Sequence, residues 1–182
     1  RAIISGYVMK KVLTEEISLR DFLKDLNTFI AADVQANSQD NFAIEKHAVQ
    51  ATKKLAVLLF QEALCEFGQD LKHEQQLSEA FADIFTHIYT SESVICRVQQ
   101  TLSSNGTSNM PVNIAKINVA ESLLEVRSLS AKCLNRIFSE NVPTSIMRSV
   151  TKLHDIINLD TDTISLKKDL GEFMIDRQDY PF

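Results

Sequence analysis

Residues that interrupt helices are scarce in this sequence of 182 residues, which contains only four glycines and three prolines. All of them lie between periodic segments or near the ends of such segments. Glycine and proline punctuate turns, so a chain built from many short strands would need more of them. Their scarcity therefore favours long helices.

The three cysteines, Cys65, Cys96 and Cys133, are odd in number and far apart, and each is set in a helical pattern. This spacing disfavours a disulfide framework or a zinc ribbon. We therefore expect all three to be small residues that face the core of a protein in a reducing compartment.

Long apolar runs and concentrated positive charge are also missing. The longest apolar run is Leu55–Phe60, which is far shorter than the roughly 18 residues needed to cross a bilayer. The net charge is -5, with basic and acidic residues interspersed, so nucleic acid is not an expected partner. Lys10 and Lys11 alone do not make a membrane-binding basic patch. Because Arg1–Gly6 has neither an initiator Met nor a secretory apolar segment, we expect a fragment of a longer protein.

The composition that remains is that of an ordinary globular domain. Apolar residues make up 45% of the sequence and charged residues 24%. A chain of this length and composition can bury a sizeable core, so we expect one soluble domain over residues 1–182.

Apolar residues recur at helical spacing along almost the whole chain. Ser18 resembles the start of a capping box, Asp40 is a plausible N-cap, and Gly68 is a natural helix end. We predict helices over residues 3–13, from 18 to about 30, over 42–67, over 75–102, between Pro111 and Pro143, over 144–157 and over 162–176.

These helices predict an all-α fold, an up-and-down helical bundle with additional short helices. Residues 1–41 would form leading helices and a loop, 42–140 three long bundle helices, and 141–182 two C-terminal helices. The segment 42–67 is apolar nearly all round in its middle, which is typical of a central helix.

The periodicity also predicts which residues face the core. A further stripe of Phe81, Phe85 and Tyr89 could grip an acyl chain, but core packing is the favoured interpretation. The predicted buried stripes of the three long helices are Ile44, Ala48, Ala51, Leu55, Leu58 and Leu59; Leu77, Phe81, Ile84, Ile88, Ile95 and Leu102; and Ile114, Ile117, Leu124, Ala131, Leu134 and Phe138.

Residue patterns that carry chemistry are not found. Di-iron bundles use Glu-x-x-His pairs, none of which is present, and Asp83 and His87 at i, i+4 have no second carboxylate–histidine set. His47, His73 and His154 have no nucleophile or orienting acid at a recognisable spacing, so all four histidines are interpreted as structural or exposed. Glycine-rich nucleotide loops and a nucleophile elbow are also missing. We therefore expect no catalytic, cofactor-binding or metal-binding residue.

Three stretches resemble the C-terminal portion of acyl-CoA dehydrogenases of the very-long-chain type, and together they cover roughly half the chain. Residues 35–42 and 102–112 are unmatched. The three stretches are Arg1–Leu13, similar to the segment after that family's Glu-Gly-Thr-Asn-Glu-Ile loop; Ala51–Gly68 with His73–Ile84 and Ile88–Ser93; and the aromatic end Asp176–Phe182.

The resemblance implies that the catalytic glutamate, the FAD and most of the acyl-CoA pocket lie upstream of Arg1. The fragment would then be an inactive, cofactor-free part of an FAD-dependent oxidoreductase. It would pack on the catalytic core and take part in a dimer. The compartment would be the cytoplasm in a bacterium, and the mitochondrial matrix or inner membrane in a eukaryote. The alternative is a free-standing helical module whose apolar stripes bind a partner helix.

Overall fold

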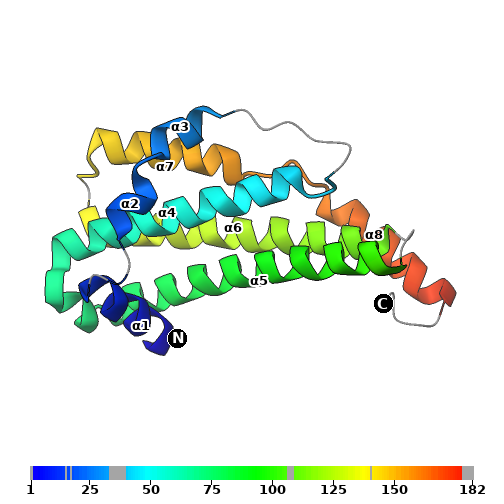
Figure 1. Cartoon of the computed structure of the whole chain (residues 1–182), viewed down its shortest axis with the longest axis horizontal. Helices are drawn as coiled ribbons and strands as arrows, with labels where there is room; N and C mark the ends of the chain where they lie inside the picture. Colours follow the sequence, from blue (N-terminus) through cyan, green and yellow to red (C-terminus); the bar gives the residue numbers. More distant parts are fainter. Residues whose placement is uncertain are drawn as a thin grey trace.

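The computed structural model describes residues 2–14, 16, 18–32, 40–105, 109–139 and 141–177, and every regular element in these ranges is a helix (Figure 1). This confirms the all-α prediction. The elements are α1 (Ala2–Leu13), α2 (Leu19–Leu23), α3 (Leu26–Ala31), α4 (Ala43–Phe67), the short 3₁₀ helix η1 (Gly68–His73), α5 (Gln75–Asn105), α6 (Met110–Phe138), α7 (Thr144–Ile157) and α8 (Thr163–Arg177).

Helices α4, α5, α6 and α7 lie side by side, and each runs in the opposite direction to the one before it (Figure 1). Helix α4 contacts α5, α6 and α7, so it is the central helix, as its apolar sequence predicts. Helix α1 packs against α5, α2 against α4, α3 against α7, and α8 against α6 at the far end of the bundle. Among the described residues, no helix is long and apolar enough to cross a membrane.

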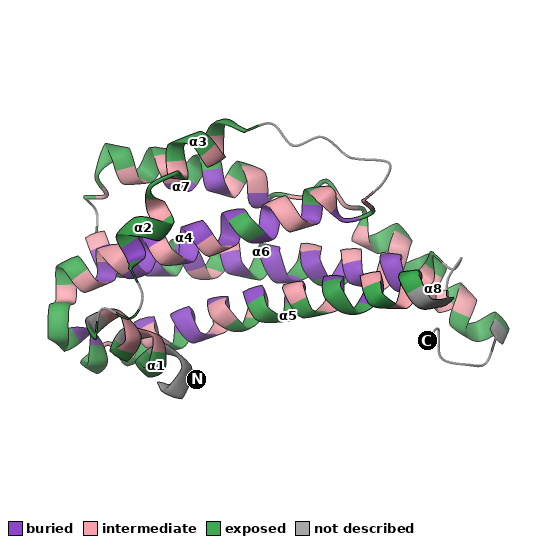
Figure 2. Ribbon diagram, in the orientation of Figure 1, coloured by how far each residue is buried: buried purple, intermediate pink, exposed green. Residues whose placement is uncertain are grey.

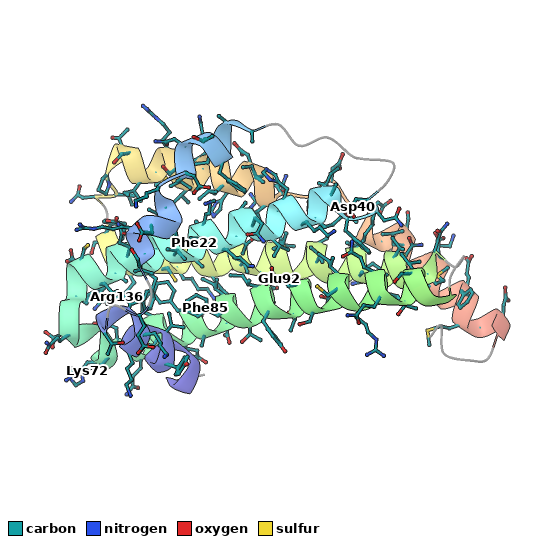
Figure 3. The ribbon with its side chains drawn as sticks, viewed as in Figure 1. Phe22, Asp40, Lys72, Phe85, Glu92 and Arg136 are labelled. Carbon is teal, nitrogen blue, oxygen red and sulfur yellow. The ribbon has the colours of Figure 1, made fainter. Side chains whose placement is uncertain are left out.

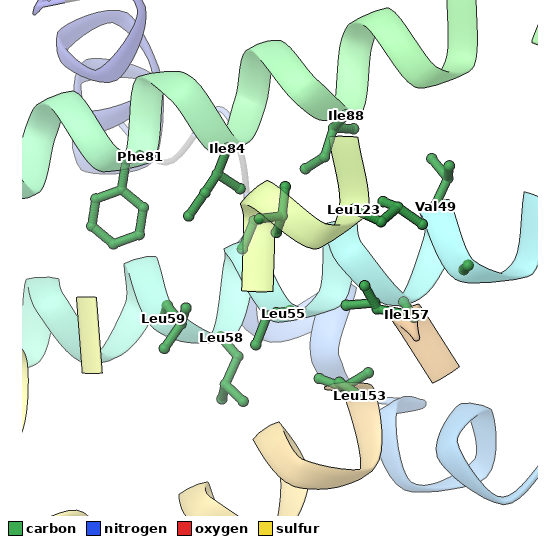
Figure 4. Packing of buried hydrophobic residues seen from close by; sticks show 14 of the residues in the cluster. Val49, Leu55, Leu58, Leu59, Phe81, Ile84, Ile88, Leu123, Leu153 and Ile157 are labelled. Carbon is green, nitrogen blue, oxygen red and sulfur yellow. The ribbon is translucent and has the colours of Figure 1, made fainter. Parts of the chain in front are cut away.

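The core lies between the long helices, and the buried residues gather on α4, α5 and α6 where these helices run together (Figure 2). On α5 the predicted residues from Leu77 to Ile95 are buried, whereas Leu102 is only half-buried. Close to the centre, Phe81 and Ile84 of α5 point toward Leu55 and Leu59 of α4 (Figure 4). On α4 the prediction is wrong only for Ile44, which lies in the exposed first turn.

The predicted buried stripe of α6 is wrong for several residues. Leu124 is 62% exposed and Ala131 is exposed, although Ile117 and Leu134 are buried. The core-facing side of α6 is displaced around the helix from the predicted stripe, so that Leu123 is buried and its neighbour Leu124 is not. Apolar residues occur on more than one side of this helix, so spacing alone does not fix which side faces the core. The residues that face the core are Val112, Ala115, Val119, Ser122, Leu123, Val126, Ser130, Cys133 and Ile137.

The single helix predicted from Ser18 to about Ile30 is in fact two short helices, α2 and α3, which are separated at Lys24 and Asp25. Ser18 accepts a hydrogen bond from the backbone N–H of Asp21 at 3.2 Å, as the capping pattern predicts. The break lets the Asp25 carboxylate and the Phe22 carbonyl both reach Lys54 of α4. A tertiary contact therefore overrides the local helical pattern.

The helix ends predicted at Gly68, Pro111 and Pro143 agree with the structure, but the N-cap of α4 is Phe42 and not the predicted Asp40. Gly68 follows α4 with a φ of 51°, a left-handed conformation that suits glycine. Asp40 lies before α4, and its Oδ1 accepts a hydrogen bond from the Phe42 N–H at 3.0 Å. Pro111 is in the first turn of α6, and Pro143 precedes α7. The predictions for the polar loop at 33–39, the loop at Gly106 and the aromatic end at 178–182 lie outside the described residues.

Candidate functional site

The structure describes no group of three His, Cys, Asp or Glu side chains that could hold a metal ion, within the ranges given above. Asp83 and His87 are both half-buried on α5. His73 is exposed on η1. The His47 ring lies on Phe29, with 4.7 Å between ring centroids, and burial lowers the pKa of His47.

One Ser–His pair does come together, between α6 and α7. The Ser130 Oγ lies 2.8 Å from His154 Nε2 and 2.8 Å from the Arg127 carbonyl oxygen. The hydroxyl has one proton, and the Arg127 carbonyl oxygen competes with the imidazole for it. A nucleophilic serine instead needs a base that takes its proton, and it needs access to substrate. Because Ser130 is fully buried, this pair connects two helices and is not a catalytic dyad.

Sequence reasoning missed this pair because 24 residues separate its members and no local spacing marks them. Arg127 completes the junction by donating a hydrogen bond from Nη1 to Asn158 Oδ1 at 2.5 Å. Burial, together with the Arg127 charge, lowers the pKa of His154, and Asp155 opposes the shift.

We expect the protein to lose stability as the pH falls from about 7 to about 5.5, because the pKa of His47 and of His154 is lower in the folded state. The unfolded chain, with the ordinary pKa of 6.5, takes up protons first. Stability is therefore lost as the pH falls below 6.5, until the pH passes the lower pKa values that the two histidines have in the folded state. Glu62, whose pKa burial raises above 4.5, acts in the opposite direction.

Denaturation midpoints across this pH range test the prediction, with the double variant His47→Gln and His154→Gln as comparison. The double variant should show a shallower pH dependence than the parent. Equal slopes in the two proteins would contradict the assignment.

The prediction that all cysteines face the core is wrong for two of them. Cys65 and Cys96 are exposed, and only Cys133 is buried. Apolar patterns in long helices are degenerate, and a small residue at the edge of a buried stripe can fall on either side of it. Burial raises the pKa of Cys133 to about 12, so its thiol is unreactive at neutral pH.

A charged cluster lies where η1 and α5 meet α6. Arg136 forms a two-point contact with Glu74, with Nε–Oε2 and Nη2–Oε1 distances of 2.8 and 2.5 Å. Its guanidinium also lies 4.8 Å from the centroid of the Phe67 ring (Figure 3). The cluster borders a cavity of about 460 Å³. Because the Arg136 charge is paired with Glu74 through two donors, we interpret the cluster as an ion pair that fastens the turn to α6.

An apolar groove of about 310 Å³ lies at the other face of this end of the bundle, between α1, α2, α4 and α5. We call it the N-terminal groove. Phe22 and Phe85, labelled in Figure 3, contribute to its walls. It can accept apolar groups but has few polar side chains for orienting a reaction. The lining residues are Val8, Ser18, Leu19, Phe22, Lys53, Ala56, Val57, Phe60, Phe85 and Ile88.

Comparison with known proteins gives a consistent family. A family model described as "Acyl-CoA dehydrogenase, C-terminal domain" matches residues 51–152, which is more than half of the chain. A curated protein of Bacillus subtilis (strain 168), "Probable acyl-CoA dehydrogenase", is 23% identical over 137 residues, covering 74% of this chain and 23% of that protein.

A solved structure shares the fold of the whole chain. It is the crystal structure of an acyl-CoA dehydrogenase complexed with FAD from Bacillus anthracis, with a TM-score of 0.84 and 18% identity. The similarity covers 100% of this chain and 31% of that one. The chain thus spans less than a third of the length of either relative.

Proposed function

Because this chain belongs to the acyl-CoA dehydrogenase C-terminal domain family, we propose that it is the non-catalytic helical domain of a longer FAD-dependent acyl-CoA dehydrogenase. The observation that carries the proposal is the family match over residues 51–152, which extends from α4 to α7. The domain packs on the catalytic core of the longer enzyme and supports its assembly as a homodimer.

The longer enzyme would oxidise an acyl-CoA to a trans-2-enoyl-CoA in fatty acid β-oxidation, and FAD would take up the hydride from the β-carbon. The N-terminal groove does not fit a flavin. The N-terminal groove offers only Ser18 and Lys53 as polar lining residues, too few to hold a diphosphate and the polar edge of a flavin ring. We therefore assign no step of the dehydrogenation to residues of this chain.

The polar contacts found here support a structural role. The pairs Ser130–His154, Arg136–Glu74 and Lys54–Asp25 each join two helical elements. The enzyme would act in the cytoplasm of a bacterium, or in the matrix or at the inner membrane of a mitochondrion. A free-standing interaction module is the second candidate, and the open N-terminal groove is the observation that favours it.

Parallel assays of the full-length protein and of residues 1–182 test the proposal. The full-length protein should purify with flavin absorbance and dehydrogenate acyl-CoA, whereas residues 1–182 alone should do neither. Turnover by residues 1–182, or a full-length protein without flavin or dehydrogenase activity, would refute it. Reading the gene upstream of Arg1 separates the two candidates, since a Glu-Gly-Thr loop a few residues earlier supports the dehydrogenase.

A further inference from the structure

Helix α1 is apolar in sequence, yet the side chains that the structure describes on it are exposed or half-buried. Its sequence, AIISGYVMKKVL, is mostly apolar. Among the α1 side chains that the structure describes, none is buried, and Tyr7 is 61% exposed while Val8 and Val12 are half-buried. Exposed and half-buried apolar side chains such as Tyr7, Val8 and Val12 are typical of a surface that meets another surface.

The N-terminal groove beside α1 reaches down to the hydrophobic core. Ala56, Phe60 and Ile88 are almost fully buried core residues, yet they also line the groove. Its rim carries Phe22, which is 40% exposed, and the half-buried Phe85. At this place the groove reaches the core from the surface.

The exposure pattern of α4 locates the opening. Between residues 51 and 60 all side chains are buried except Lys53 and Val57, which lie one turn apart on the same face. Both line the groove. The face of the central helix that α5, α6 and α7 leave uncovered is therefore the face that the groove exposes.

The charges at the rim of the N-terminal groove indicate what kind of partner surface can bind there. Lys53 Nζ lies 2.5 Å from Glu92 Oε1, so its positive charge is already compensated. An anionic ligand would have to displace this carboxylate, whereas an apolar protein surface could cover the pair without breaking it. The groove therefore fits apolar side chains of a protein.

The size of the longer protein indicates what binds in the N-terminal groove. The whole of this chain superposes on only 31% of the Bacillus anthracis structure, so most of such a protein lies beyond the part that this chain matches. Interfaces between domains of one chain bury roughly 600–1,500 Å² and include apolar contacts. A concave apolar surface lined by four helices is a suitable centre for such an interface.

We propose that the N-terminal groove is the docking surface for the catalytic part of the same longer polypeptide, which inserts apolar side chains onto Phe60 and Phe85 beside α1. This inference rests on the proposed function. The inference adds to the proposed function by specifying which face of the domain contacts the catalytic part.

Photo-cross-linking in the full-length protein tests the inference. The substitution Phe22→p-benzoylphenylalanine places a photoreactive benzophenone at the exposed rim of the groove. After irradiation and digestion, we expect a cross-link to a peptide outside residues 1–182, in a product with the mass of one chain. The matched control is Met147→p-benzoylphenylalanine on α7, which is 44% exposed and away from the groove, and should give no such product.

Each other outcome overturns the inference. These outcomes are no product at position 22, a product with twice the chain mass, and cross-links confined to peptides within residues 1–182. The same probe at Tyr7 of α1 serves if the Phe22 variant does not fold. Flavin content and acyl-CoA turnover are measured on the same samples. An active flavoprotein without the cross-link would refute the docking surface alone, whereas the absence of flavin and turnover would refute the proposed function.

Discussion

Phe81→Ala is expected to lower the free energy of unfolding by about 3–5 kcal/mol, the usual cost of removing a large buried aromatic side chain. Phe81 is fully buried on α5 and points toward α4 (Figure 4). Its ring lies 5.1 Å from the ring of Phe60, at an interplanar angle of 82°. This edge-to-face pair joins α4 and α5, so truncation leaves a cavity between these two helices.

The same stripe of α5 supplies matched controls. Phe85, one turn further, is half-buried at the N-terminal groove, and Tyr89, two turns further, is 72% exposed. Phe85→Ala should therefore cost less than Phe81→Ala, and Tyr89→Ala should change stability by less than about 0.5 kcal/mol. Urea denaturation followed by circular dichroism measures all three. Equal losses at the three positions would contradict the burial gradient.

This stripe shows what the sequence could predict. Spacing alone places Phe81, Phe85 and Tyr89 on one face of a helix, and it favours core packing. Spacing cannot show that the stripe crosses from the core to the surface within two turns, because that depends on where α1 and α2 end. The long helices and their termini follow from local rules, but the limits of the core follow from how separate elements pack.

Helix α6 and the Ser130–His154 contact illustrate the same limit. The apolar spacing selected Leu124, whereas the helix presents Leu123, Val119 and Cys133 to the core, because which side faces inward depends on how α4 and α5 pack against it. The Ser130–His154 contact joins α6 to α7 and has no signature within either helix. The N-terminal groove likewise could not be predicted, because its walls come from four helices that are separate in the sequence.

One lysine of α4 contacts both short helices, α2 and α3. Lys54 is 7% exposed, and its Nζ lies 2.6 Å from Asp25 Oδ1 and 3.2 Å from the Phe22 carbonyl oxygen. The ammonium also lies 4.9 and 5.2 Å from the ring centroids of Phe22 and Phe29. A single side chain therefore contacts both short helices and the break between them.

Lys54→Ala is expected to lower the free energy of unfolding by about 2 kcal/mol, because it removes the ion pair, the contacts with two aromatic rings and the packing of the alkyl chain. Lys54→Met keeps the alkyl packing and removes the charge. Its loss should stay below about 1 kcal/mol, because a buried ion pair is often replaced by an apolar side chain at little cost. The charge of Asp25 stays hydrated, since 65% of its side chain is exposed.

Hydrogen exchange distinguishes loss of this attachment from general destabilisation. In Lys54→Ala, amides of residues 19–31 should exchange faster, while those in the middle of α5 should keep their protection relative to global unfolding. A loss in Lys54→Met as large as in Lys54→Ala would show that the charge, and not the packing, provides the stability. Unchanged exchange in residues 19–31 would show that α2 and α3 are held by other contacts, such as the burial of Leu19.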